Sequence, residues 1–226
     1  MRALLALSIA LLTALPVAPA QAGGCALALV LATDVSSSID AREYRAQQDG
    51  LADAFRAPAL REALLGSGDV HVRVTLVHWS GYRHQEQVVP WTALTDAGAV
   101  DGFAARVRAA PRRHDDKATA LGKGLEFSAR LLRGQPCDRH IIDLSGDGIN
   151  NIGIGPHYFA ERGDFDGITI NGLAIRGAMP DPLPYFREHV ARGPGSFVVA
   201  AEGYGDYART ILRKLLREIA LRYTMR

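Results

Sequence analysis

Residues 26–38 read Ala26-Leu27-Ala28-Leu29-Val30-Leu31-Ala32-Thr33-Asp34-Val35-Ser36-Ser37-Ser38, and this stretch decides the fold. Its first half is an apolar run typical of a strand buried on both faces of a sheet. One carboxylate and two hydroxyls, Asp34, Ser36 and Ser38, then follow at alternate positions. Such oxygens, completed by water, suit Mg²⁺, which prefers octahedral oxygen geometry. The alternative interpretation is that Asp34 and Ser36 cap a helix that begins near Asp40.

Asp34-x-Ser36-x-Ser38 after a buried strand resembles the metal-ion-dependent adhesion site of von Willebrand factor A domains. That family's site also uses a threonine and an aspartate from two later loops. The chain offers both in order, in Ala118-Thr119-Ala120-Leu121-Gly122 and in Leu144-Ser145-Gly146-Asp147-Gly148. The resemblance implies a site for Mg²⁺, or for Mn²⁺ or Ca²⁺, made of Asp34, Ser36, Ser38, Thr119 and Asp147. In the family, some of these oxygens hold the metal directly and others through water, and a ligand carboxylate completes the coordination.

Two later segments resemble one particular branch of this family. They are similar to a secreted bacterial branch that carries only the label domain of unknown function 1194, and they read Asp143-Leu144-Ser145-Gly146-Asp147-Gly148 and Ile168-Thr169-Ile170-Asn171-Gly172-Leu173. The resemblance covers nearly the whole mature chain. It departs at Ser145-Gly146, where many relatives have a threonine.

The first residues have the pattern of a secretory signal peptide. A short basic end, Met1-Arg2, precedes an apolar core that is too short for a comfortable membrane span, and Ala20-Gln21-Ala22 offers an Ala-x-Ala cleavage site. We expect residues 1–22 to be removed and a von Willebrand factor A-like domain, residues 23–226, to be secreted into the periplasm. The alternative is a lipoprotein with a lipid on Cys25, but the leucine usual three residues before such a cysteine is missing.

Composition limits the class of protein. A mature length of roughly 200 residues fits one domain. The chain is 48% hydrophobic with a net charge of only +2, so disorder and a general nucleic-acid surface are not expected. The sequence has no nucleophile elbow, phosphate-binding loop, dinucleotide-binding loop or H-E-x-x-H motif. We therefore predict a protein that is not an enzyme.

The periodicity of the chain alternates between strands and helices. Strands are expected at 26–33, 70–79, 85–94, 139–144, 168–175 and 196–201, and helices at 39–65 with a break near Pro58, 96–109, 121–132, 158–162, 184–190 and 206–223. This alternation predicts an α/β fold with a doubly wound, mostly parallel sheet and helices on both faces, and 85–94 as an antiparallel edge. In the strand order 3-2-1-4-5-6, Asp34 and Asp147 end neighbouring strands at one crevice. Two carboxylates there repel each other unless a cation lies between them.

Three charged features of the sequence need an interpretation within the predicted fold. The loop 111–117 leads into Thr119 and is expected to lie beside the site as a solvated loop. Asp143 interrupts a buried strand, so it needs a hydrogen-bond partner, and we interpret it as structural. The terminal helix places an apolar face on the sheet, and its charged residues, Lys214 and Glu218 among them, are expected in solvent rather than on a membrane.

A disulfide between Cys25 and Cys137 is expected for three reasons. The chain is predicted to be exported, and these are its only cysteines. Cys25 precedes Asp34 by nine residues and Cys137 precedes Asp147 by ten, so on neighbouring parallel strands both would lie at the end opposite the metal site. Their α-carbons could then approach the ~5.5 Å that a disulfide requires.

The function expected from these features is binding. A secreted domain would hold a divalent cation and, through it, a carboxylate of a protein partner, without contact to nucleic acid or membrane. One alternative is a metal-dependent phosphate-ester hydrolase, although no general base is evident and no covalent nucleophile beyond Asp34 itself. Another is a structural domain with a vestigial metal site.

Overall fold

The structure is a computed structural model that describes residues 24–66, 70–114 and 118–220. The expected signal peptide, residues 1–22, lies outside the described residues. The same holds for 221–223, the end of the expected terminal helix. Within the described ranges, no helix is both long and apolar enough to cross a membrane.

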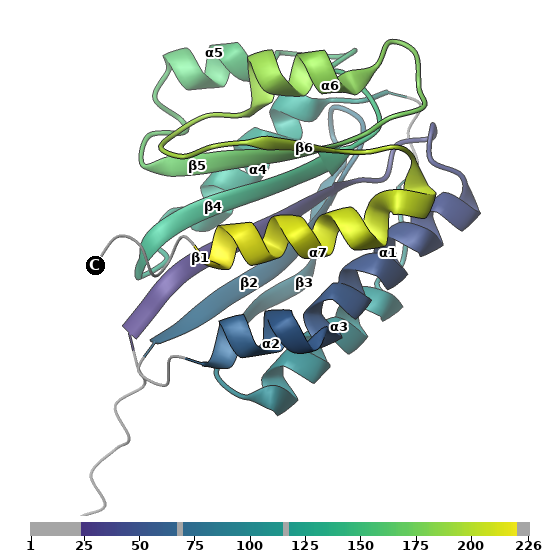
Figure 1. The fold of residues 1–226 in the computed structure, drawn as a ribbon. Helices are drawn as coiled ribbons and strands as arrows, with labels where there is room; N and C mark the ends of the chain where they lie inside the picture. Colours follow the sequence, from purple (N-terminus) through teal and green to yellow (C-terminus); the bar gives the residue numbers. More distant parts are fainter. Residues whose placement is uncertain (1–23, 67–69, 115–117, 221–226) are drawn as a thin grey trace, which may run out of the picture.

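A six-stranded sheet in the order β3-β2-β1-β4-β5-β6 forms the middle layer (Figure 1). The strands are β1 (Gly24–Asp34), β2 (Val70–Trp79), β3 (Gln85–Leu94), β4 (Cys137–Gly146), β5 (Ile168–Ile175) and β6 (Val198–Ala201). Neighbouring strands are parallel except β3, which pairs antiparallel with β2 at the edge. Pro90 of β3 is exposed there, where a missing N–H is tolerated. The predicted fold class and strand order are confirmed.

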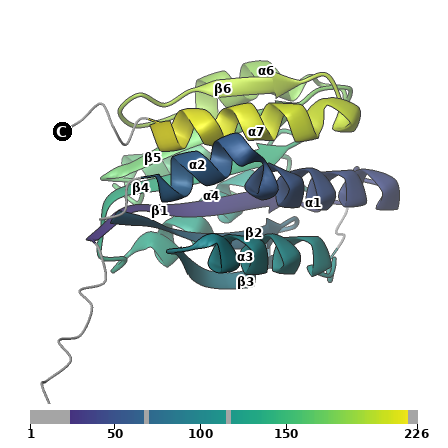
Figure 2. The same cartoon turned by 60° about the horizontal axis from the view of Figure 1, so that its bottom comes forward.

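Helices cover both faces of this sheet. They are α1 (Ala41–Arg56), α2 (Pro58–Leu65), α3 (Ala97–Ala109), α4 (Leu121–Leu132), α5 (Pro156–Glu161), α6 (Pro182–Tyr185), the π-helix η1 (Phe186–Val190) and α7 (Tyr204–Ala220). Figures 1 and 2 show α1, α2, α3 and α7 on the same side of the sheet. The other side packs against α4, α5 and η1. The helix expected over 39–65 is two helices, because Pro58 begins a new one.

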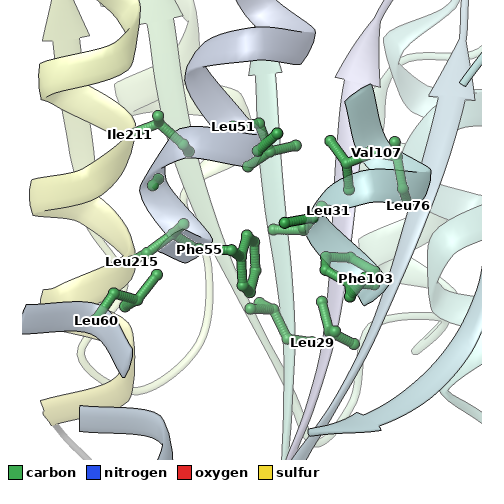
Figure 3. Close-up of a cluster of buried hydrophobic side chains, with 14 of the residues drawn as sticks. Leu29, Leu31, Leu51, Phe55, Leu60, Leu76, Phe103, Val107, Ile211 and Leu215 are labelled. Carbon is green, nitrogen blue, oxygen red and sulfur yellow. The ribbon is translucent and has the colours of Figure 1, made fainter. Parts of the chain in front are cut away.

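The central strand β1 supplies side chains to both cores. Its odd-numbered residues, Leu27 to Leu31, pack with α1, α3 and α7, and its even-numbered residues, Ala28 to Ala32, pack with α4. Figure 3 shows Leu29 and Leu31 beside Phe55 and Phe103. Because both faces are covered, the strand has an apolar run without polar alternation. This run fixes where Asp34 leaves the sheet.

A disulfide joins Cys25 of β1 to Cys137 of β4, with the two α-carbons 4.5 Å apart. The two residues face each other in the parallel register of these strands. The predicted bond is thus confirmed, and it lies at the amino ends of the strands. Since a sulfur atom in a disulfide cannot also carry a lipid, the lipoprotein alternative does not fit this structure.

Helix α7 places charged groups inside the protein. Lys214 Nζ lies 2.6 Å from Asp143 Oδ1 and 2.8 Å from Glu218 Oε1, and all three residues are at most 2% exposed. Asn171 of β5 also donates to Glu218, at 2.8 Å. Our expectation that Lys214 and Glu218 face solvent is wrong: positions 211, 214, 215, 218 and 219 all lie on the buried face of the helix. Asp143 therefore finds its partner within the core.

The buried Glu218 predicts a pH dependence of stability. Burial, and then the nearby Asp143, raise the pKa of Glu218 from 4.5 to about 8. The folded protein thus keeps a proton that the unfolded chain releases above its own pKa, so stability falls as the pH rises from about 4.5 to about 8. Between pH 5.5 and 8.5, urea unfolding should show a loss on the order of 2 kcal/mol that Glu218→Gln lacks. Parallel pH profiles for the two proteins would contradict the prediction.

Candidate metal site

The predicted site lies at the edge of the sheet where the parallel strands have their carboxyl ends. The N–H of Ser36 donates to Asp34 Oδ1 at 2.8 Å, which closes the turn after β1. Ser36 Oγ lies 3.2 Å from Ser38 Oγ, and Ser38 Oγ donates to Asp147 Oδ1 at 2.9 Å. Four of the five predicted residues are thus connected, and they bridge the ends of β1 and β4.

Thr119, the fifth residue, is held next to this chain of contacts by Asn151. The N–H of Thr119 donates to Asn151 Oδ1 at 2.7 Å, and the N–H of Asn151 donates to the Thr119 carbonyl at 3.0 Å. The hydroxyl oxygen of Thr119 lies 3.4 Å from the position that a Cβ would take on Gly148. Thr119 therefore borders the loop directly after Asp147.

Asp34 is the least satisfied group of the site. It is fully buried, and its Oδ2 has no hydrogen-bond partner in the part of the chain that the structure describes. Burial, and then the charge of Asp147, raise the pKa of Asp34 to about 7, and burial is also the main cause that raises the pKa of Asp147. A buried carboxylate oxygen without a partner is costly. A cation between the two carboxylates would remove that cost.

The room around Asp34 depends on Gly146. A Cβ on Gly146 would lie 3.0 Å from Asp34 Oδ2 and 3.2 Å from its Cβ, and real Cβ atoms rarely approach so closely. Glycine at this position keeps the Asp34 carboxylate uncrowded. The departure at Ser145-Gly146 is therefore compatible with an open site.

The capping interpretation of Asp34 and Ser36 is wrong. Asp40 caps α1, since its Oδ1 accepts from the N–H groups of Arg42 at 2.7 Å and Glu43 at 2.8 Å. The Glu43 carboxylate in turn accepts from the N–H of Asp40 at 2.8 Å, which completes a capping box. The oxygens of Asp34 and Ser36 are therefore not needed by the helix.

Arg112 is a positioning residue that the sequence did not reveal. Its guanidinium donates to the carbonyl of Val35 at 2.9 Å and to the carbonyl of Ser36 at 2.7 Å. The described part of this loop, residues 111–114, thus reaches the turn through Arg112, as expected, but Arg112 binds the protein instead of solvent. Asp115 and Asp116 of this loop lie outside the described residues.

The donor set fits a hard cation. Across residues 24–66, 70–114 and 118–220, no three or more His, Cys, Asp or Glu side chains are arranged to hold a metal ion. The candidate site instead offers two carboxylates together with the hydroxyls of two serines and a threonine. Such an all-oxygen set suits Mg²⁺, Mn²⁺ or Ca²⁺ better than a soft metal.

Several solved structures share this fold. Proximal thread matrix protein 1 from the mussel byssus is 18% identical with a TM-score of 0.63, over 89% of this chain and 49% of that one. A von Willebrand factor type A structure from Catenulispora acidiphila is 17% identical with a TM-score of 0.63, over 86% and 43%. The vWF domain of the type V pili tip protein Mfa5 from Porphyromonas gingivalis is 12% identical with a TM-score of 0.57, over 88% and 97%.

These similarities support only the fold, because all three sequence identities are low. The chain spans about half the length of the mussel protein. Another structure of that mussel protein, 15% identical with a TM-score of 0.60 over 89% of this chain and 49% of that one, is described with a zinc occupied MIDAS motif, the metal-ion-dependent adhesion site. No curated protein matches the chain.

A family profile described as "Protein of unknown function (DUF1194)" matches residues 24–223, a range that includes every described residue. Both this match and the solved structures agree with the resemblance drawn from the sequence. The chain belongs to the DUF1194 family and has the fold of a von Willebrand factor A domain.

Proposed function

We propose that this domain binds a divalent cation through Asp34, Ser36, Ser38, Thr119 and Asp147 and, through the cation, a carboxylate of a protein partner. The observation that carries the proposal is the buried Asp34 Oδ2, which has no partner in the described part of the chain and lies close enough to Asp147 to be repelled by its charge. A bound cation would supply a positive centre for an anionic ligand. Arg112 would keep the turn in place by holding two of its carbonyls.

The proposed location is outside the cytoplasm, in the periplasm. The Cys25–Cys137 disulfide supports it, since such bonds persist in oxidising compartments. The signal-peptide pattern of residues 1–22 supports it as well. Among proteins of similar fold, one is described as a pilus adhesin from Lactobacillus rhamnosus GG and one as a pilus tip protein.

We infer a binding protein rather than a phosphate-ester hydrolase. The carboxylate of Asp34 accepts from the backbone of Ser36, and the Asp34 carbonyl accepts from Gln47 Nε2 at 3.0 Å. Neither of these two groups can act as a general base for hydrolysis, and the nearby carboxylate, Asp147, is itself a proposed metal ligand. Assays with p-nitrophenyl phosphate and Mg²⁺ or Mn²⁺ should give no turnover, whereas turnover abolished by Asp34→Ala would favour the hydrolase.

Asp34→Ala should reduce Mg²⁺ and Mn²⁺ binding to below detection while the fold is retained. The residue lies at the end of a strand, and its removal also ends the repulsion with Asp147. Isothermal titration calorimetry measures the binding, and circular dichroism checks the fold. Without metal, the melting temperature of the variant should equal or exceed that of the wild type.

Ser37→Ala is the matched control for this experiment. Ser37 lies in the same turn, is exposed and is not one of the proposed ligands. Its substitution should leave metal affinity unchanged, whereas Ser36→Ala should weaken it. Equal Mg²⁺ binding by the wild type and by Asp34→Ala would refute the assignment.

A further inference from the structure

Within the described ranges, most of the large apolar side chains that are exposed lie in loops that follow the carboxyl ends of strands. They are Tyr82, Ile152, Ile154, Tyr158 and Met179. Four belong to the loops that follow β2, β4 and β5, and Tyr158 lies in the first turn of α5. These loops leave the carboxyl ends of the strands, as Asp34 and Asp147 do. A clustering of exposed apolar groups is typical of an interaction surface.

Three of these residues come from two loops that contact each other, and we call them the apolar patch: Tyr82, Ile152 and Ile154. Each is 39–45% exposed. The Tyr82 ring packs on the backbone between the two isoleucines, since a Cβ on Gly153 would lie 2.6 Å from a ring carbon. The patch therefore joins the β2–β3 turn to the loop after β4.

The apolar patch is fixed to the candidate metal site. Asn150 Oδ1 accepts from the N–H of Gly122 at 3.0 Å, while its Nδ2 donates to the carbonyl of Ile152 at 3.2 Å. The adjacent Asn151 holds Thr119, as described above. The carbonyl of Ile154 packs so closely on α4 that a Cβ on Gly122 would lie 2.2 Å from its oxygen. These contacts hold the apolar patch beside the proposed metal ligands.

Charge favours an acidic ligand on this side of the site. Segments 80–85 and 148–160 carry Arg83 and two histidines but no aspartate or glutamate. On the opposite side, the starts of α1 and α7 carry the carboxylates of Asp40, Glu43, Glu202 and Asp206, of which Glu202 and Asp206 pair with Arg176 and Arg209. An acidic side chain that approaches over the patch avoids like charges.

We propose that the partner offers a protein segment in which an acidic residue is directly adjacent to a large apolar residue. The acidic side chain reaches the bound cation, and its apolar neighbour covers the apolar patch. The segment leaves the α1 and α7 side uncovered. This inference rests on the proposed function and adds the direction of approach and the chemistry of the second contact.

A peptide series tests the inference. Labelled peptides Gly-Ser-Gly-Xaa-Asp-Xaa-Gly-Ser-Gly, with Phe, Leu or Ser at both Xaa positions, are titrated with the full mature chain and Mg²⁺, and fluorescence anisotropy measures binding. The Phe and Leu peptides should bind about tenfold more tightly than the Ser peptide, as partial burial of an apolar side chain predicts. Ile152→Ser and Ile154→Ser should each reduce this difference to less than threefold.

Met179→Ser is the matched control, because Met179 is 92% exposed but lies in the loop after β5, outside the apolar patch. It should keep the tenfold preference. A loss in Met179→Ser as large as in Ile152→Ser would indicate unspecific adhesion and overturn the inference. Patch-dependent sedimentation with phosphatidylcholine vesicles would assign the patch to lipid and also overturn it.

Calorimetry with Mg²⁺ alone separates the two proposals. Ile152→Ser should bind Mg²⁺ like the wild type, because the side chain contributes no ligand. If the wild type binds Mg²⁺ but all three peptides bind equally, or none binds, the inference fails and the metal assignment stands. If Asp34→Ala binds Mg²⁺ like the wild type, the metal assignment fails.

Discussion

Replacing Lys214 with alanine is expected to lower the free energy of unfolding by about 3–5 kcal/mol. The ammonium group is fully buried and lies within 2.8 Å of carboxylate oxygens of both Asp143 and Glu218. Its removal leaves two carboxyl groups inside the core without their cation. Urea unfolding at neutral pH, followed by circular dichroism, measures the loss.

Two further variants show whether the buried pairing is the cause. Arg213→Ala removes the neighbouring cation of α7, which is exposed, and should change stability by no more than about 0.5 kcal/mol. The triple variant Lys214→Met, Asp143→Asn and Glu218→Gln replaces all three ionisable side chains together and should recover most of the stability. A loss below 1 kcal/mol for Lys214→Ala would contradict this account.

Replacing both cysteines with alanine is expected to destabilise the fold by about 4.7 kcal/mol, the chain-entropy value for a closed loop of roughly 100 residues. The disulfide joins residues 112 positions apart in the sequence. It lies at the amino ends of β1 and β4, whereas Asp34 and Asp147 follow their carboxyl ends. Urea unfolding of wild type and Cys25→Ala/Cys137→Ala measures the difference in stability.

Metal affinity is the control for the cysteine variant. At a temperature where the variant is folded, its Mg²⁺ titration should match that of the wild type. Treatment of the wild type with a reductant should reproduce the loss of stability without a substitution. A stable variant that no longer binds Mg²⁺ would mean that the two ends of these strands are coupled, contrary to our expectation.

The sequence predicts the fold well where the pattern of apolar and polar residues reflects how a segment is buried. The run from Ala26 to Thr33 has no polar alternation, which requires cover on both faces, and α4 and α7 provide part of it. Strand order and register then bring Cys25 to Cys137, and the ends of the same two strands bring Asp34 to Asp147. The approach of Asp34 and Asp147 at the ends of two neighbouring strands could therefore be predicted.

Contacts between single side chains and distant backbone could not be predicted. Arg112 reaches the carbonyls of Val35 and Ser36, more than seventy residues earlier in the chain, and no periodicity marks such a bond. Asn151 beside Thr119 is a similar case. The prediction for Lys214 failed for a different reason. A charged residue on a helix is normally solvated, and contacts with Asp143 and Glu218 make the burial of Lys214 tolerable.

The position of β1 also affects how the chain reaches this structure during synthesis. β1 is the first strand of the chain, but it lies in the middle of the sheet between β2 and β4. Its partner β4 begins 113 residues after β1 does. Both edges of this apolar strand can therefore be paired only after half of the chain has been synthesised. Such long-range pairing is slow and exposes apolar backbone to aggregation. An unpaired β1, with the thiol of Cys25 still reduced, is therefore the segment of the newly synthesised chain most in need of a chaperone.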